Sequence, residues 1–121
     1  MRILTKRVYE APTRTDGYRV LVDRLWPRGI SKSNAALDEW CKELAPSDEL
    51  RKWFSHDPDK WAEFSRRYTR ELNAKKDQVN ALLNRTHART ITLLYAAKDA
   101  EHNNAMVLKR YIDSHLSAQA A

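Results

Sequence analysis

The spacing of apolar residues changes along the chain, and this change predicts an α/β order of elements. Residues 3–9 alternate in a mixed pattern that suits a strand exposed along one side, so we predict an edge strand there. Residues 19–24 contain an unbroken apolar run, typical of a strand covered on both faces, and residues 90–95 contain another. The long helical stretch between them favours a crossover, so we predict that these two strands are adjacent and parallel.

Helical spacing dominates the sequence between residues 34 and 83. We predict a first helix over residues 34–44, a second that Ser47 caps, a third that starts at Asp57-Pro58, and a short fourth around residues 79–83. The first of these places four residues on one buried stripe: Leu37, Trp40, Cys41 and Leu44. A final helix is expected over residues 101–116, followed by a frayed tail over residues 117–121.

The 121 residues suffice for one hydrophobic core, so we predict a single domain over residues 1–121. Its fold class is α/β, with a short, mostly parallel sheet of about three strands flanked by helices. Nothing in the sequence resembles a membrane span or a signal peptide, so we expect a cytoplasmic protein without a membrane partner. The single cysteine, Cys41, is expected to be an inert core thiol.

Charge adds a functional expectation to this fold. Lys and Arg number 22 against 16 acidic residues, a net charge of +6, and most of the excess lies in the first 32 residues. A positive field concentrates anions such as phosphorylated metabolites, carboxylates or nucleic acid. A merely basic, soluble surface is the alternative interpretation.

Polar residues gather where the two central strands end. The first cluster follows residues 19–22 and consists of Asp23, Arg24, Trp26 and Arg28. The second cluster ends the other strand and consists of Tyr95, Lys98, Asp99, His102, Asn103 and Asn104. Because the carboxyl ends of parallel strands open on the same edge of a sheet, we expect the two clusters to face each other across a ligand site. His56, in the loop before the long helix, is placed to reach the same site.

Each of these side chains has a chemical and a structural interpretation. In the chemical one, Arg24, Arg28 and Lys98 hold an anion, Trp26 or Tyr95 supplies a stacking wall, and His56 and Asn103 add ligand contacts. His102, with Asp23 or Asp99, would move a proton. In the structural one, Asp23 and Arg24 pair with each other or with backbone, Trp26 belongs to the core, and Asp99 or His102 caps the last helix.

The sequence favours no metal and no cofactor. Asp99 and His102 have a spacing that suits two ligands on a helix, with His56 or Asp57 nearby, but nothing fixes a third ligand. With only Gly17 and Gly29 in the chain, the glycine-rich phosphate loops of nucleotide-cofactor proteins are absent, as are the Gly-x-Ser-x-Gly and His-Glu-x-x-His motifs.

Several long motifs resemble a known family. They are Asp16-Gly-Tyr-Arg-Val-Leu-Val-Asp-Arg-Leu-Trp-Pro-Arg-Gly29, Leu44-Ala-Pro46, Leu50-Arg-Lys-Trp-Phe54, His56-Asp-Pro58, Leu93-Leu-Tyr-Ala-Ala-Lys-Asp99 and Glu101-His-Asn103. Together they resemble the YeaO-like proteins, part of the domain-of-unknown-function family four-eight-eight. The resemblance covers nearly the whole chain and implies a compact cytoplasmic bacterial α/β domain with no assigned activity or catalytic residues.

Two kinds of function remain open at this point. The first is an enzyme or binding domain for a small anionic molecule, such as a nucleotide-like one, which a pocket lined by both clusters would favour. The alternative is a nucleic-acid-associated protein or a protein-interaction module without catalysis, favoured by a flat basic face or by an exposed apolar patch. Against nucleic acid, no recognition motif is present and the basic residues do not share one helix. The sequence does not specify an oligomeric state.

Overall fold

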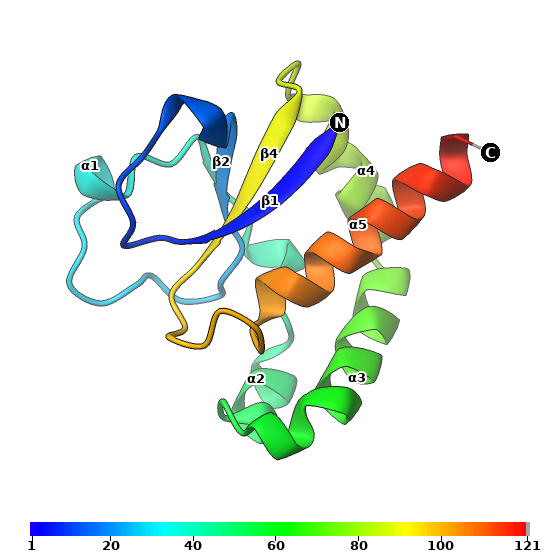
Figure 1. The fold of residues 1–121 in the computed structure, drawn as a ribbon. Helices are drawn as coiled ribbons and strands as arrows, with labels where there is room; N and C mark the ends of the chain where they lie inside the picture. The colour runs from blue at the N-terminus through cyan, green and yellow to red at the C-terminus, as the bar shows by residue number, and fades with distance from the viewer. Residues whose placement is uncertain (121) are drawn as a thin grey trace.

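A parallel sheet in the order β1-β4-β2-β3 organises the chain in the computed structural model, which describes residues 1–120, with side chains through residue 118 (Figure 1). The strands are β1 (Arg2–Arg7), β2 (Tyr18–Leu21), β3 (Glu39–Trp40) and β4 (Thr90–Tyr95). The helices are α1 (Lys32–Ala35), α2 (Asp48–Phe54), α3 (Trp61–Asn73), α4 (Lys76–Arg85) and α5 (Asn104–Ala120). The predicted α/β class is confirmed, and the sheet has one more strand than expected, the two-residue β3.

The two central strands pair as the apolar runs predicted. β2 lies parallel to β4, with Tyr18 opposite Ile91 and Leu21 opposite Leu94. β1 pairs with the other side of β4 and forms one end of the sheet, so the predicted edge strand is also confirmed. β1, β2 and β4 therefore end on the same edge of the sheet.

Helices cover one face of the sheet, and the other face has a thinner cover. Val20 and Val22 belong to a large core with α2, α3, α4 and α5, whereas Leu21 points the opposite way, as alternation along a strand requires. The second, smaller cluster packs residues of α1 and of the loop after β2 on that opposite face. Val20, Leu21 and Val22 are completely buried, in agreement with a strand covered on both sides.

The predicted helix over residues 34–44 is wrong. α1 ends at Ala36, whose φ of 50° is left-handed, and residues 38–41 then run beside β2. The Arg19 N–H donates to Asp38 Oδ2 at 2.8 Å, the Asp38 N–H donates to the Arg19 carbonyl at 2.9 Å, and the Cys41 N–H donates to the Leu21 carbonyl at 2.9 Å. This segment thus pairs with the free edge of β2 as a short strand, because buried backbone groups need hydrogen-bond partners. The expected apolar stripe is split between the two cores.

α2 and α3 start close to their predicted caps. Ser47 Oγ accepts the Leu50 N–H at 3.2 Å at the start of α2. Asp57 and Pro58 begin a short 3₁₀ turn, Pro58–Lys60, that continues directly into α3. α5 begins at Asn104 and ends at Ala120. Residues 117–120, which we expected to be frayed, are therefore helical, and Ala121 lies outside the described residues. Within residues 1–120 no helix is both long and apolar enough to cross a bilayer.

A buried ionic network holds the segment before β2. Asp16 and Arg19 are each 4% exposed, and their side chains are 2.6 Å apart. Lys6 of β1 lies 3.1 Å from the same carboxylate, and Arg19 also donates to the Ala35 and Ala36 carbonyls. The network therefore connects β1, β2 and the end of α1, and no local sequence pattern indicates it.

Cys41 is completely buried, as predicted, although it follows β3 instead of lying on a helix. Burial and a 3.2 Å bond to Glu43 raise the pKa of the thiol to about 12. Because the thiolate is the reactive form, we expect labelling of the native protein at pH 8 to be at least about a hundredfold slower than labelling in urea. Rapid stoichiometric labelling of the native protein by an aromatic disulfide reagent would contradict this assignment.

Candidate functional site

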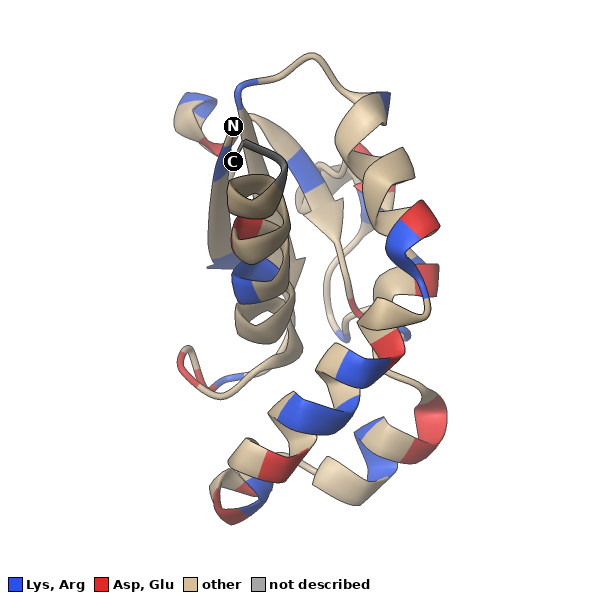
Figure 2. Ribbon diagram, turned by 90° about the vertical axis from the view of Figure 1, so that its right-hand side faces the viewer, with Lys and Arg blue, Asp and Glu red and all other residues tan. Residues whose placement is uncertain are grey.

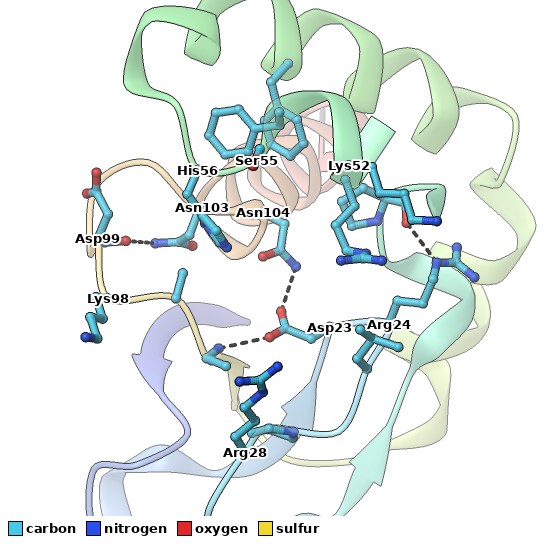
Figure 3. A pocket seen from close by; sticks show the side chains of 18 of the residues that line it. Asp23, Arg24, Arg28, Lys52, Ser55, His56, Lys98, Asp99, Asn103 and Asn104 are labelled. Carbon is cyan, nitrogen blue, oxygen red and sulfur yellow. Dashed lines mark hydrogen bonds between the residues drawn. The ribbon is translucent and has the colours of Figure 1, made fainter. Parts of the chain in front are cut away.

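A cavity of about 850 Å³ opens at the edge where β2 and β4 end (Figure 3). The loop after β2, the end of α2, the loop after β4 and the start of α5 form its walls. It brings together nine residues of the two predicted clusters and the loop before α3: Asp23, Arg24, Trp26, Arg28, His56, Lys98, Asp99, Asn103 and Asn104. The parallel pairing of β2 with β4 produces this convergence, since it places both strand ends side by side.

Tyr95 and His102 are not brought to this cavity. Tyr95 is 4% exposed and belongs to the large core, because alternation along β4 turns it toward the helices. His102 Nδ1 lies 2.8 Å from Asp99 Oδ2, and the imidazole edge contacts Trp61 at 5.2 Å between ring centroids. The imidazole of His102 therefore contacts the start of α3. It does not line the cavity, where the sequence predicts it as a proton-transfer group.

Asp23 ties three elements together at the base of the cavity. Its Oδ2 accepts the Ala96 N–H at 2.9 Å, and its Oδ1 accepts from Asn104 Nδ2 at 3.1 Å (Figure 3). Asn104 Nδ2 also donates to the Val22 carbonyl at 2.9 Å. Burial raises the pKa of Asp23, and the bonds from Ala96 and Asn104 offset only part of that effect. Both carboxylate oxygens are thus held by the protein, and Asp23 does not pair with Arg24.

The predicted cations differ in how freely they can meet a ligand. Arg24 Nε donates to the Pro46 carbonyl at 3.1 Å, which directs this side chain along one wall. Arg28 and Lys98 have no side-chain partner among the described residues. Arg28 points into the cavity near Asp23, whereas Lys98 lies at its rim and points outward (Figure 3). Arg28 is therefore the cation best placed to contact an anion.

Two further cations, Arg51 and Lys52 of α2, line the cavity and were missed. Both pair with Asp48, at 2.6 Å and 3.0 Å, yet Arg51 Nε is buried without a hydrogen-bond partner. The sequence placed them on the polar side of α2 but gave no sign that this side borders the strand ends. Only the path of the crossover brings them there.

The loop after β2 is held in place by two aromatic side chains. Trp26 Nε1 donates to the Ile30 carbonyl at 2.8 Å, and its ring meets Trp40 edge-on at 5.3 Å. Tyr9 donates its hydroxyl hydrogen to the Arg28 carbonyl at 2.7 Å. Trp26 thus lines the cavity and also belongs to the smaller core, so its chemical and structural interpretations both apply.

The opposite wall contains left-handed backbone at two successive residues that are not glycine. Ser55, which ends α2, has φ 46°, and His56 has φ 56°. Such conformations cost about 1–3 kcal/mol each and persist where surrounding structure enforces them, often at ligand sites. The adjoining wall is apolar, with Phe54 and Phe64 stacked at 4.2 Å. The strained turn therefore places His56 beside an aromatic surface.

The N-terminal cap of α5 differs from the expected one. Asn103, which is 1% exposed, accepts the Met106 N–H at 3.1 Å and so caps the helix. Asp99 instead caps the preceding turn by accepting the N–H groups of Glu101 and His102. These bonds, that of Glu101 foremost, lower the pKa of Asp99. Asp99 is therefore anionic, at the edge of the cavity.

The residues considered as metal ligands do not form a cluster. Among the described residues, the one group with metal-ligand spacing is Glu39, Cys41 and Glu43, none of which lines the cavity. Arg85 bonds to Glu39 and lies 3.8 Å from the Cys41 sulfur, so a guanidinium already occupies that group. We assign no metal to either place.

Comparison with known proteins places the chain among uncharacterised relatives. It is 46% identical over 114 residues to the uncharacterised protein YeaO of Escherichia coli K12, covering 94% of this chain and 99% of that protein. An uncharacterised protein of Mycobacterium tuberculosis H37Rv is 39% identical over 114 residues, 93% of this chain and 94% of that one. No solved structure matches the chain significantly. Since the family model described as the inactive DUF488-N3 subclade matches residues 2–121, the chain belongs to this subclade of the DUF488 proteins.

Proposed function

We propose that this protein binds a small phosphate-bearing molecule of nucleotide size without transforming it. The observation that carries the proposal is the convergence on one cavity of Arg24 and Arg28, from the loop after β2, with Lys52 of α2. Including Arg51 and Lys98, five cations line it against two carboxylates, Asp23 and Asp99. Such a site attracts a ligand that carries more than one negative charge.

The cavity also has the size and the walls for an organic group beside the phosphate. Its volume of about 850 Å³ lies in the range of sites for drug-sized ligands, roughly 300–1,000 Å³. Phe54 and Phe64 offer an apolar surface on which a planar ring can pack. These features favour a nucleotide-like molecule over an inorganic ion.

Binding without catalysis is supported by the groups around the cavity and by the family. Asp23 has both oxygens engaged by the fold, and His102 is turned away toward Trp61. General acid or base catalysis needs a positioned group within reach of the substrate. His56 lines the cavity, but among the described residues no hydrogen-bond partner positions its imidazole. The description of the subclade as inactive agrees with a site that retains binding alone. We place this activity in the cytoplasm, where an unpaired cysteine is ordinary.

Calorimetric titration with matched ligands tests this proposal. We expect adenosine monophosphate to bind at least about tenfold more tightly than adenosine, because each charge-assisted bond contributes about 1.5–3 kcal/mol. Ribose 5-phosphate against ribose repeats the comparison without the base. Equal affinities within both pairs, or no binding of either phosphate ester at millimolar concentration, would contradict the proposal.

A further inference from the structure

A second basic hollow lies between α3 and α5, which pack against each other. It has a volume of about 650 Å³ and is lined by Arg66 and Arg70 of α3 and by Arg110 of α5. Bands of Lys and Arg along α3 and α5 are visible in Figure 2. No acidic residue lines this groove among the described residues, so its lining is positive throughout.

The polar groups of the groove are incompletely satisfied. Ser65 Oγ is buried and has no hydrogen-bond partner, although it belongs to the lining. Arg70 and Arg110 make no ion pair within the described residues, whereas Arg66 pairs with Glu63 on the outer side of α3. Arg70 and Arg110 are exposed and have no carboxylate partner, so their guanidinium groups are free to exchange water for phosphate oxygens.

The arrangement suits an extended ligand with repeated phosphates. Arg66 and Arg70 are four residues apart on α3, which places them on one face about 6 Å apart along the helix axis. Tyr111 adds an aromatic ring to the same groove, with its hydroxyl 3.1 Å from Asn73 Oδ1. A cationic groove with an aromatic side chain is the combination by which proteins bind single-stranded nucleic acid.

We propose that the α3–α5 groove binds the phosphate backbone of single-stranded nucleic acid. Arg70 and Arg110 contact successive phosphates, and Tyr111 packs against a base. This site is separate from the cavity at the strand ends and shares no lining residue with it. It also differs from the basic N-terminal third from which the sequence suggested nucleic-acid binding.

Fluorescence anisotropy with a labelled twelve-nucleotide RNA tests the proposal. We expect Arg70→Ala combined with Arg110→Ala to weaken RNA binding at least about tenfold. The slope of log affinity against log salt concentration should become shallower by about 2, because two phosphate contacts are removed. Tyr111→Leu should weaken binding severalfold at every salt concentration. Circular dichroism melting of each variant checks that the fold persists. If the alanine variant unfolds, Arg70→Lys combined with Arg110→Lys replaces it. This variant keeps the charge and should retain most of the affinity for RNA.

The matched control is Arg14→Ala combined with Lys32→Ala, which removes the same charge from exposed positions outside both hollows. This control should change the affinity less than about twofold. Three outcomes would overturn the proposal: no binding of RNA by the unaltered protein, an equal loss in the control, or equal displacement of RNA by a polyglutamate peptide of the same charge. The last outcome would indicate an acidic protein partner.

Discussion

Asp16→Asn should cost about 3–5 kcal/mol of unfolding free energy, the typical effect of breaking a buried ion pair. The carboxylate is 4% exposed and neutralises both Arg19 and Lys6. Asparagine has nearly the same shape, so little packing changes. It leaves the Arg19 guanidinium, itself 4% exposed, without a counter-charge between β2 and α1.

The same network predicts the pH dependence of stability. Burial opposes ionisation of Asp16, but hydrogen bonds from Thr13, Lys6 and Arg19 outweigh it and lower the pKa from 3.8 to about 2. A depressed pKa in the folded state means that the stabilisation is complete above about pH 4 and is lost as the pH falls toward 2. The loss attributable to Asp16 is about 2 kcal/mol.

Urea unfolding of the unaltered protein and of Asp16→Asn, at pH 7 and at pH 3, measures both effects. The variant should show the large loss at pH 7 and a weaker dependence on pH. Asp48→Asn is the matched control, because Asp48 also pairs with two cations but is half exposed, and it should shift the unfolding midpoint little. Equal midpoints for Asp16→Asn and Asp48→Asn would show that the buried network does not stabilise the fold.

Arg28→Ala combined with Lys52→Ala should reduce the affinity for adenosine monophosphate by about a hundredfold. Each side chain is expected to contribute at least one charge-assisted bond of about 1.5–3 kcal/mol, and Arg28→Ala alone should lose about tenfold or more. Both residues are exposed, and Arg28 has no side-chain partner within the described residues, so the melting temperature should stay nearly constant.

Arg14→Ala combined with Lys32→Ala is the control for net charge. It removes the same two positive charges, but from residues that do not line the cavity. This variant should keep its affinity within about twofold at 0.15 M salt, where distant exposed charges are screened. Calorimetry on the three proteins gives the comparison. A hundredfold loss shared by both double variants would mean that the general positive field, and not the cavity, binds the nucleotide.

The sequence was most informative where the core determined the structure. The apolar runs within residues 19–24 and 90–95 are buried on both faces, so their composition predicted the strands, and the long helical crossover between them predicted the parallel pairing. The caps Ser47 and Asp57 act locally, and local signals can be read without the fold. The strand ends and the loop before α3 then predicted where nine of the cavity residues would meet.

Prediction failed where tertiary contacts overrode local spacing. Residues 34–44 have helical periodicity, yet the free backbone groups at the edge of β2 draw residues 38–41 into the sheet. Arg51 and Lys52 reach the cavity through the path of α2, which no short pattern reveals. His102 follows Asp99 at a spacing that allows a local bond, and that bond, with the contact to Trp61, turns the imidazole away from the ligand site.

Two-dimensional amide NMR during titration with adenosine monophosphate tests the central claim most directly, because it shows where the ligand binds. We expect the largest shifts at the backbone of Asp23, Ala96 and Asn104 and at the side-chain amide of Asn104, which surround the base of the cavity. Residues of the α3–α5 groove should move far less. Shifts confined to that groove, or spread evenly over the basic surface, would contradict a phosphate-binding cavity at the ends of β2 and β4.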